Sequence, residues 1–511
     1  MHQIDISSLD SLERKLYQLI ISRLDGEKLA SDDYREGIRR LAGKGIGGFI
    51  LFGGERDEIR NFIKELQSIA AVPLFIASDI ERGVAQQIEG TSPFPCQMAV
   101  AAAIDRNNPD EVRLLEDAVR AVAAEAGDLG INMPLIPVMD VNLDPDNPII
   151  CTRAFSDDPG EVAWFGSRYI SVLEGVGLIS CAKHFPGHGD TSVDSHISLP
   201  VIAKPKQELM ETEIAPFAAA IKAGAGSIMV GHLTAPALDS RPASLSKKVI
   251  TGLLREELGY DGLVLTDALN MNALDGIGNI TVECLNAGAD ILLHPLDADA
   301  AVKELLEGCR SKRLDEERLE EAVRRIMQAK AKLRASGPAG TAPRGHTELS
   351  SRIVAGSITL VKGTGSVPVS FGAPAAPINT EDAHLVFAGD AKAYELSPLK
   401  KAFARISPIG ETGEISAGTA IFALFTSVAA WRGSSGIDVS ERERILRLIE
   451  TSRKSVVVSF GSPYVLRYFH EADILIAAYE ASGQAQEAVL GCLRGESGFK
   501  GRLPVRLGMD S

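Results

Sequence analysis

The sequence predicts an α/β protein in which a (β/α)8 TIM-like barrel precedes a smaller α/β sandwich domain. The chain has 511 residues, more than one hydrophobic core usually fills, which indicates more than one domain. Short apolar runs alternate with helical-looking stretches along most of the chain, and this alternation is typical of β-α units around a parallel sheet. With 45% hydrophobic and 24% charged residues, the composition excludes a disordered or collagen-like chain.

Seven apolar runs in the first part of the chain are the candidate strands of the barrel. They cover residues 47–53, 73–79, 131–141, 178–185, 226–232, 262–268 and 290–295. A charged helix expected over 314–333 closes this region, and the Gly- and Pro-rich segment 335–346 that follows has no periodicity. We therefore predict a barrel over residues 1–335, a linker over 336–346 and a second domain over 347–511.

Five further apolar runs follow the linker, with helical stretches between several of them. They cover residues 357–363, 384–390, 420–426, 455–461 and 473–479. Strands that are apolar along their whole length are typical of a sheet buried on both faces. The second domain is therefore predicted to be an open sheet covered by helices on both sides.

Charge and cysteine usage exclude several classes of partner and site. The formal net charge of −15 repels phosphate backbones and anionic lipid, so a nucleic-acid partner is not expected. The six cysteines are scattered singly with no CxxC pair, which favours free buried thiols over disulfides or a zinc knuckle.

The amino terminus lacks the basic patch and apolar stretch of a secretory signal, and the apolar stretch 419–431 is shorter than the ~20 residues that cross a bilayer. We expect a cytoplasmic protein without a membrane span.

Polar residues stand at the carboxyl ends of the predicted barrel strands. They are Asp79, Asp140, Lys183 with His184, His232, Asp267 and His294. The loops at these ends build the active site of a (β/α)8 barrel, so acids, histidines and a lysine there indicate a functional site. Any one of these polar residues could simply be solvated at the end of its strand. Solvation explains less well why an acid, a histidine or a lysine recurs at six strand ends.

The segment AKHFPGHGDTSVDSH, residues 182–196, is the densest polar cluster and is expected to be a loop because proline and glycine interrupt it. Its histidines and aspartates could form a metal site, since both residue types are good ligands for zinc or iron. The fixed cation of Lys183 opposes a bound metal ion, and no helix can place these histidines on one face. We expect no metal and no organic cofactor. A metal-dependent barrel hydrolase that uses His184, His188, Asp190 and His196 is the rival hypothesis.

Asp194 and His196 are candidates for an acid/base pair. In an extended segment, residues i and i+2 point the same way, so the carboxylate can hold one imidazole nitrogen while the other faces a substrate. The carboxylate would favour the protonated imidazole and keep its pKa in a useful range for catalysis near neutrality. A histidine beside an acid in an ordinary loop is the structural alternative.

Asp267 ends the apolar run 262–268 where the chain turns toward a helix. An aspartate in this position can simply cap the helix. An ionised carboxylate that faces a barrel mouth can instead attack an anomeric carbon and form a covalent glycosyl intermediate, while a separate group protonates the leaving oxygen.

Long blocks of the sequence resemble glycoside hydrolase family 3, and specifically its bacterial β-N-acetylglucosaminidase branch. KHFPGHGDTSVDSH (183–196) and LTDALNM (265–271) are similar to the two signatures of that branch. Further similar stretches are NLDPDNPIICTRAFSDDP (142–159), PASLSKKVITGLLREELGYDG (242–262), VVVSFGSPYVL (456–466) and GRLPV (501–505). The last two lie in the second domain that longer members contain, so the resemblance spans nearly the whole chain.

The resemblance implies a role for each matching position. Asp267 would be the nucleophile, His196 the acid/base and Asp194 its orienting partner. The sugar-binding residues would be Asp79, Arg153, Lys183 and His184. The implied activity is that of a retaining, exo-acting β-N-acetylglucosaminidase that hydrolyses terminal β-linked N-acetylhexosamine.

Two features leave the substrate and the acceptor open. The DQEGG-like element of the family reads DIERGVAQQ here (79–87), with Gln87 where an arginine is expected and Arg82 added nearby. A neutral histidine base does not repel an anion as a carboxylate would, so a β-glycoside phosphorylase is an alternative to a hydrolase. A sugar-binding or scaffolding protein without turnover would lack a nucleophile or an acid/base, and neither is missing.

Overall fold

The computed structural model describes residues 9, 11–191, 199–274, 276–336, 345–363, 383–413, 415, 418–427 and 436–508. The chain divides into two compact units. The first unit comprises Met1–Phe94, Glu116–Val141 and Pro159–His346. The second comprises Pro95–Leu115, Asn142–Asp158 and Thr347–Ser511. Two segments that precede residue 160 thus pack with the carboxyl-terminal part of the chain.

Parallel strands form a barrel in the first unit. One sheet has the order β4-β3-β2-β1-β8 and a second has the order β5-β6-β7. The strands are β1 (Ile20–Asp25), β2 (Gly48–Phe52), β3 (Phe75–Ser78), β4 (Met133–Pro134), β5 (Cys181–Phe185), β6 (Ser227–Val230), β7 (Leu263–Thr266) and β8 (Leu292–Leu293). Parallel bridges from Val138 to Lys183 and from Leu265 to Ile291 join the two sheets at both edges. Within the described part of the chain the strands therefore close into a (β/α)8-type barrel, which confirms the predicted fold.

Strand β1 is the barrel strand that the sequence analysis missed. Its sequence is IISRLD, and Ser22 and Arg23 in its middle are partly or fully exposed. These two polar residues interrupt the apolar run that marked the other strands. Pairing with β2 and β8 forms the strand, because both neighbours offer a parallel edge in register with it.

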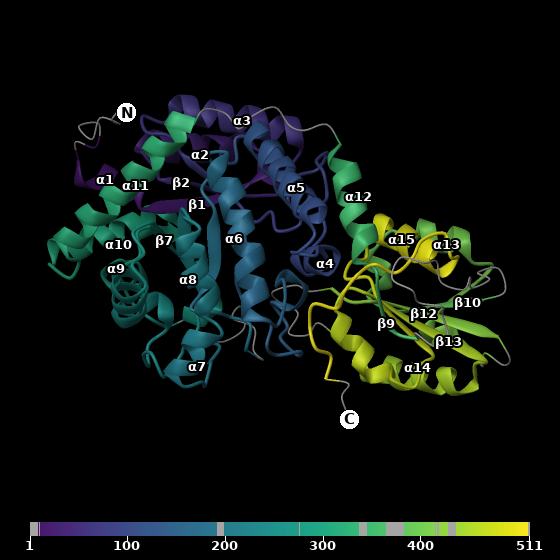
Figure 1. The fold of residues 1–511 in the computed structure, drawn as a ribbon. Coiled ribbons are helices and arrows are strands. Elements are labelled where there is room, and N and C mark those ends of the chain that lie inside the picture. The colour runs from purple at the N-terminus through teal and green to yellow at the C-terminus, as the bar shows by residue number, and fades with distance from the viewer. Residues whose placement is uncertain are drawn as a thin grey trace. The chain divides into compact units, whose positions relative to one another are not determined.

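Helices surround the barrel strands in the first unit, as Figure 1 shows for α5, α6 and α8. The helices that lie wholly or mostly in this unit are α1 (Leu12–Gln18), α2 (Asp32–Lys44), α3 (Arg56–Ile69), α5 (Pro109–Asp128), α6 (Pro159–Gly175), α7 (Lys206–Glu211), α8 (Ala215–Lys222), α9 (Ile280–Ala287), α10 (Ala298–Arg310) and α11 (Glu316–Ser336). A π-helix covers Lys248–Glu257. Helix α2 shows why such segments fold locally: the Ser31 hydroxyl accepts the N–H of Tyr34 at its start, and Gly45 ends it with φ 86°.

The second unit contains a six-stranded sheet in the order β11-β10-β12-β13-β14-β9. The strands are β9 (Thr359–Lys362), β10 (His384–Gly389), β11 (Arg405–Pro408), β12 (Thr419–Phe425), β13 (Lys454–Phe460) and β14 (Ile474–Ala477). All pairs are parallel except β9 with β14. The sequence analysis did not predict β11, whose residues RISP include only one aliphatic side chain, Ile406, and are all partly or fully exposed.

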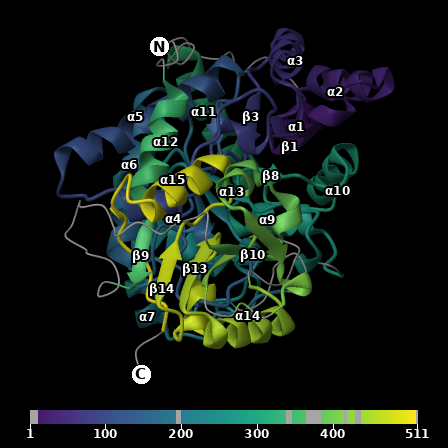
Figure 2. The ribbon, with the colours of Figure 1, turned by 90° about the vertical axis from the view of Figure 1, so that its right-hand side faces the viewer.

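Helices cover both faces of this sheet, as predicted. Alternate residues of β12 point to opposite sides, so Phe422 and Leu424 pack in one core with Leu448 of α14, while Ile421 and Phe425 belong to another. The helices of this unit are α4 (Gln97–Ala103), α12 (His346–Ser357), α13 (Ser397–Ala402), α14 (Val439–Thr451) and α15 (Gly483–Leu493). Figure 2 shows α14 on one side of the sheet and α13 and α15 on the other. Among the described residues, no helix combines the length and the apolar character needed to span a bilayer.

Candidate active site

A buried lysine in the middle of β5 pairs with two carboxylates that follow the carboxyl end of β3. Nζ of Lys183 lies 2.6 Å from Oδ1 of Asp79 and 2.7 Å from Oε1 of Glu81. The side chains of Lys183 and Glu81 are 1% and 6% exposed, whereas that of Asp79 is 29% exposed. Because a buried ammonium needs opposite charge nearby, the two acids hold the lysine in place. The exposed part of Asp79 can still accept hydrogen bonds from a ligand.

A second polar cluster surrounds Asp140, which follows the short strand β4. Its carboxylate is fully buried and accepts hydrogen bonds from Nδ1 of His184 at 2.7 Å and from the backbone N–H of His184 at 3.1 Å. It also accepts the backbone N–H of His188 at 2.7 Å. Since a carboxylate only accepts, Nδ1 of His184 carries the proton of this bond. The sequence analysis placed Asp140 at a strand end but assigned it no role.

His188 lies beside this cluster and is held neutral. Its ring centroid is 6.0 Å from that of His184, and its Nδ1 is 2.8 Å from Oγ1 of Thr191. Burial, with a smaller contribution from His184, lowers the pKa of His188 to about 4. His188 therefore adds no positive charge to the site at neutral pH.

Asp267 follows β7 and is held by the neighbouring main chain. Its backbone N–H donates to the carbonyl of Val230 at 2.9 Å, and its Oδ1 accepts the N–H of Ala268 at 2.8 Å. The side chain is partly exposed. This geometry keeps one carboxylate oxygen bound to the backbone and leaves the carboxylate at the barrel mouth.

Three of the charged groups described above act on the buried thiol of Cys181, the first residue of β5. Burial raises its pKa to about 11. The charges of Lys183, Asp79 and Asp267 all act on this thiol, the first lowering its pKa and the other two raising it. The structure thus brings together Asp79, Lys183 and Asp267, which the sequence analysis had placed at three separate strand ends.

Several predicted residues are not part of this described cluster. Asp194 and His196 lie outside the described residues. Arg153 belongs to the second unit, where its Nη1 donates to the carbonyl of Ile149 at 3.3 Å and its own carbonyl accepts from Gln97 at 2.9 Å.

The altered DIERGVAQQ element packs a neutral amide against Asp79. Nε2 of Gln87 donates to the backbone carbonyl of Asp79 at 3.2 Å. The side chain of Arg82 is exposed, and its backbone N–H donates to Oε1 of Gln86 at 2.8 Å. Gln87 therefore binds the backbone of Asp79 through a neutral hydrogen bond. In the family pattern described above, an arginine is expected at the position of Gln87.

The structure adds Glu81 to the residues near the site, whereas His232 and His294 were already placed at strand ends from the sequence. Glu81 could have been found from its place in the DIERG element, two residues after Asp79. His294 follows β8 with φ 49°, and its ring centroid is 5.8 Å from that of Phe52. Burial and the nearby Arg23 lower the pKa of His294 to about 4.

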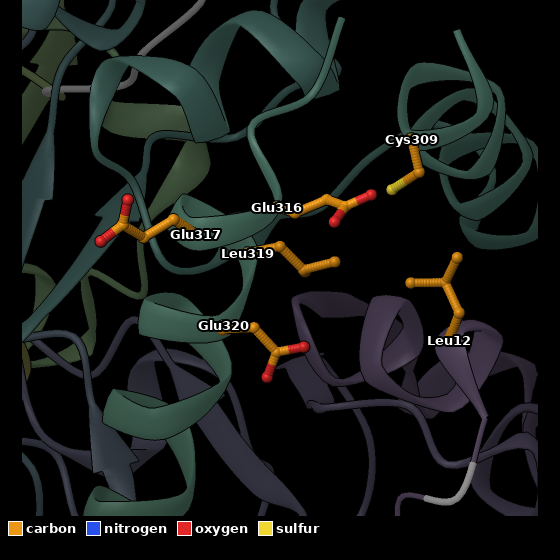
Figure 3. A pocket seen from close by; sticks show the side chains of 6 residues that line it. All are labelled: Leu12, Cys309, Glu316, Glu317, Leu319 and Glu320. Carbon is orange, nitrogen blue, oxygen red and sulfur yellow. The ribbon is translucent and has the colours of Figure 1, made fainter. Parts of the chain in front are cut away.

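The described residues also contain a cavity away from these strand ends. Its volume is about 330 Å³. Figure 3 shows the side chains from α1, α10 and α11 that line it, which are Leu12, Cys309, Glu316, Glu317, Leu319 and Glu320. None of the strand-end residues takes part. Within the described ranges, no group of three or more His, Cys, Asp or Glu side chains is arranged to hold a metal ion.

Comparison with known proteins gives consistent matches over most of the chain. Residues 11–329 match the model of the glycosyl hydrolase family 3 N-terminal domain. The chain is 32% identical over 403 residues to beta-hexosaminidase A of Pseudoalteromonas piscicida. The aligned region covers 71% of this chain and 66% of that protein, so the chain spans just under two thirds of this relative's length. It is 30% identical over 514 residues to a beta-N-acetylglucosaminidase/beta-glucosidase of Cellulomonas fimi, with 90% and 88% of the two chains covered.

Two solved structures are similar over nearly the whole chain. One is a glycoside hydrolase family 3 beta-N-acetylglucosaminidase from Paenibacillus sp. str. FPU-7, with a TM-score of 0.82, 30% identity, and 98% of this chain and 100% of that chain covered. The other is a beta-glucoside phosphorylase, with a TM-score of 0.85, 25% identity, and 99% of this chain and 96% of that chain covered.

Proposed function

We propose that the chain, which belongs to glycosyl hydrolase family 3, is a retaining, exo-acting β-N-acetylglucosaminidase. The observation that carries this proposal is the ion pair of Lys183 in β5 with Asp79 after β3, together with Asp267 directly after β7, on strands of one barrel. The beta-hexosaminidase and beta-N-acetylglucosaminidase names of its relatives support the choice of sugar. The substrate is a carbohydrate with a terminal β-linked N-acetylhexosamine.

The reaction follows the double displacement of retaining glycosidases. Asp267 attacks the anomeric carbon as the bond to the leaving oxygen breaks, and His196 gives that oxygen a proton. The product is a glycosyl ester of Asp267. His196 then takes a proton from water, which attacks the same carbon and releases Asp267, so the β configuration is retained. Asp194 orients the imidazole of His196 in both steps.

The described residues supply the binding side of this scheme. The exposed part of Asp79 accepts hydrogen bonds from sugar hydroxyls, and Lys183 keeps this carboxylate in place. Asp140 fixes the orientation of the His184 ring, which is proposed as a further ligand of a sugar hydroxyl. Arg153 is proposed as a further sugar ligand on the strength of its motif. No metal ion or organic cofactor takes part in any of these steps.

Removal of the nucleophile tests the proposal. We expect Asp267→Ala to lower hydrolysis of an aryl β-N-acetylglucosaminide by at least about 10³-fold, because the covalent intermediate can no longer form. Added azide should restore release of the phenol and yield the α-glycosyl azide, since the small anion enters the space of the missing carboxylate. An Asp267→Ala protein that turns over near the wild-type rate would overturn the assignment.

Phosphate is the second candidate acceptor, and the similarity to the solved beta-glucoside phosphorylase favours it as the alternative. A neutral imidazole base does not repel phosphate, so phosphate could attack the glycosyl ester in place of water. Turnover in the presence and absence of phosphate, with the product followed by NMR, separates the two functions. A hydrolase releases β-N-acetylglucosamine without phosphate, whereas a phosphorylase of the same double-displacement mechanism makes a β-sugar 1-phosphate.

A further inference from the structure

His232 lies at the end of β6 and connects two segments that the proposed function does not use. Its side chain is fully buried. Nδ1 lies 2.8 Å from the hydroxyl oxygen of Ser244, and Nε2 lies 3.3 Å from the carbonyl oxygen of Ala268. Ser244, in the PASLSK stretch, is also fully buried. The imidazole therefore links this stretch to the residue that follows Asp267.

The partners of His232 decide where its protons lie. A carbonyl oxygen only accepts hydrogen bonds, so Nε2 must carry a proton to bind Ala268. In the neutral ring Nδ1 is then an acceptor, and the hydroxyl of Ser244 donates to it. The Ala268 carbonyl thus fixes the tautomer of His232, and the Ser244 hydroxyl satisfies the other ring nitrogen.

The peptide unit between Ala268 and Leu269 is held at both of its polar atoms. Its carbonyl oxygen accepts from His232, and its N–H donates to the carbonyl of Leu293 at 2.9 Å. The preceding peptide N–H, that of Ala268, donates to Oδ1 of Asp267 at 2.8 Å. Among these contacts on the turn, His232 supplies the side-chain donor, whereas Leu293 and Val230 contribute backbone carbonyls.

We propose that His232 and Ser244 are positioning residues for the carboxylate of Asp267. The inference rests on the proposed role of Asp267 as nucleophile. Loss of the His232 contact frees the Ala268–Leu269 peptide to rotate, which moves the N–H group that fixes Oδ1. A displacement of about 1 Å at a reacting group can lower the rate by about 10²-fold, so an effect on kcat is expected without a comparable effect on substrate binding.

Substitutions at these two positions test the proposal. His232→Phe keeps the ring and removes both polar nitrogens, whereas His232→Gln retains an amide N–H that can reach the Ala268 carbonyl. Ser244→Ala removes the hydroxyl that binds Nδ1 of His232. The matched control is Ser227→Ala, because Ser227 is equally buried, begins the same strand, and donates to the carbonyl of Ser180 at 2.7 Å.

We expect His232→Phe to lower kcat for an aryl β-N-acetylglucosaminide by about 10- to 100-fold, with KM changed less than about threefold. His232→Gln should recover most of this loss, Ser244→Ala should show a smaller fall in kcat, and Ser227→Ala should keep the wild-type kcat. Thermal unfolding of each full-length variant shows whether it is folded at the assay temperature.

Two results would overturn the proposal. One is a folded His232→Phe protein with wild-type kcat, and the other is equal loss of kcat in Ser244→Ala and Ser227→Ala. The azide experiment on Asp267→Ala separates this failure from failure of the proposed function. If azide rescues that variant but His232→Phe has normal kcat, only the positioning role is wrong. If His232→Phe is too unstable to assay, the kcat values of His232→Gln and Ser244→Ala are compared with that of the wild type. A wild-type kcat in both variants would overturn the positioning role of His232 and Ser244.

Discussion

The carboxylate of Asp140 lies 2.7 Å from Nδ1 of His184, and both side chains are buried, with 0% and 8% of their surfaces exposed. The same carboxylate accepts two backbone N–H groups of the loop that carries the signature histidines. One buried acid therefore determines both the orientation of the ring and the path of the loop. Hydrogen bonds to a buried charged group are worth more than those between neutral groups, so this contact should be sensitive to substitution.

Replacement of Asp140 by asparagine should lower kcat/KM by about 10- to 100-fold. The amide oxygen can still accept the two backbone N–H groups, but the amide nitrogen then faces Nδ1 of His184. Nδ1 can no longer donate to this side chain, so the orientation and the hydrogen-bonding character of the His184 ring change. Steady-state kinetics with an aryl β-N-acetylglucosaminide checks this, and a kcat/KM within twofold of wild type would contradict it.

Removal of the cation between Asp79 and Glu81 should destabilise the fold. Lys183→Met removes the ammonium that pairs with the buried carboxylate of Glu81, which costs about 3–5 kcal/mol. Urea denaturation measures this loss. The double variant Lys183→Met/Glu81→Gln should recover part of it, because the second substitution removes the buried charge. Equal unfolding free energies for the wild type and the single variant would show that the ion pair is not needed.

Stability should fall as the pH is lowered from about 6.5 toward about 4. The pKa of His188 is about 4 in the folded protein because burial disfavours its charged form, whereas the unfolded chain has the ordinary value near 6.5. Between these values the unfolded state binds the proton and the folded state does not, so each pH unit removes about 1 kcal/mol. Urea midpoints at pH 7, 6 and 5 measure the slope. The His188→Gln variant should show a smaller slope of stability against pH. An unchanged slope in this variant would show that a group other than His188 is responsible for the loss of stability.

Gly189 should not tolerate a side chain. A Cβ atom there would lie 1.7 Å from the carbonyl oxygen of Val141, so the loop would have to move away from the barrel. We expect Gly189→Ala to lower both the melting temperature and kcat. The matched control is Gly175→Ala at the end of α6, where nothing lies within 4 Å of the added atom. Similar melting temperatures and rates for the two variants would contradict the prediction.

Chelation should not affect turnover if the proposed mechanism is right. EDTA treatment followed by gel filtration is expected to leave the rate within about 20% of the untreated protein, because the scheme needs no metal ion. Elemental analysis of the purified protein accompanies the assay. Loss of activity that zinc or another divalent ion restores would favour the rival metal-dependent hydrolase.

Local patterns predicted most of the barrel but not all of its strands. The run GGFILFG is apolar at nearly every position, so its burial as β2 could be inferred from the residues alone. Strand β1 carries Ser22 and Arg23 in its middle, and its pairing with β2 and β8 depends on residues distant in the chain. Edge strand β11 was missed for the same reason, since its polar residues form a strand by pairing with β10.

The sequence by itself determined the chemistry available at the barrel mouth: Asp79, Lys183, His184 and Asp267 could be placed there because each ends an apolar run. Only the tertiary structure decided their partners. Lys183 pairs with an acid 104 residues away, and His184 with one 44 residues away. Such contacts form because closing the barrel brings strand ends together, and a buried charge or ring nitrogen is stable only where a partner from another strand meets it. No local pattern encodes that distance.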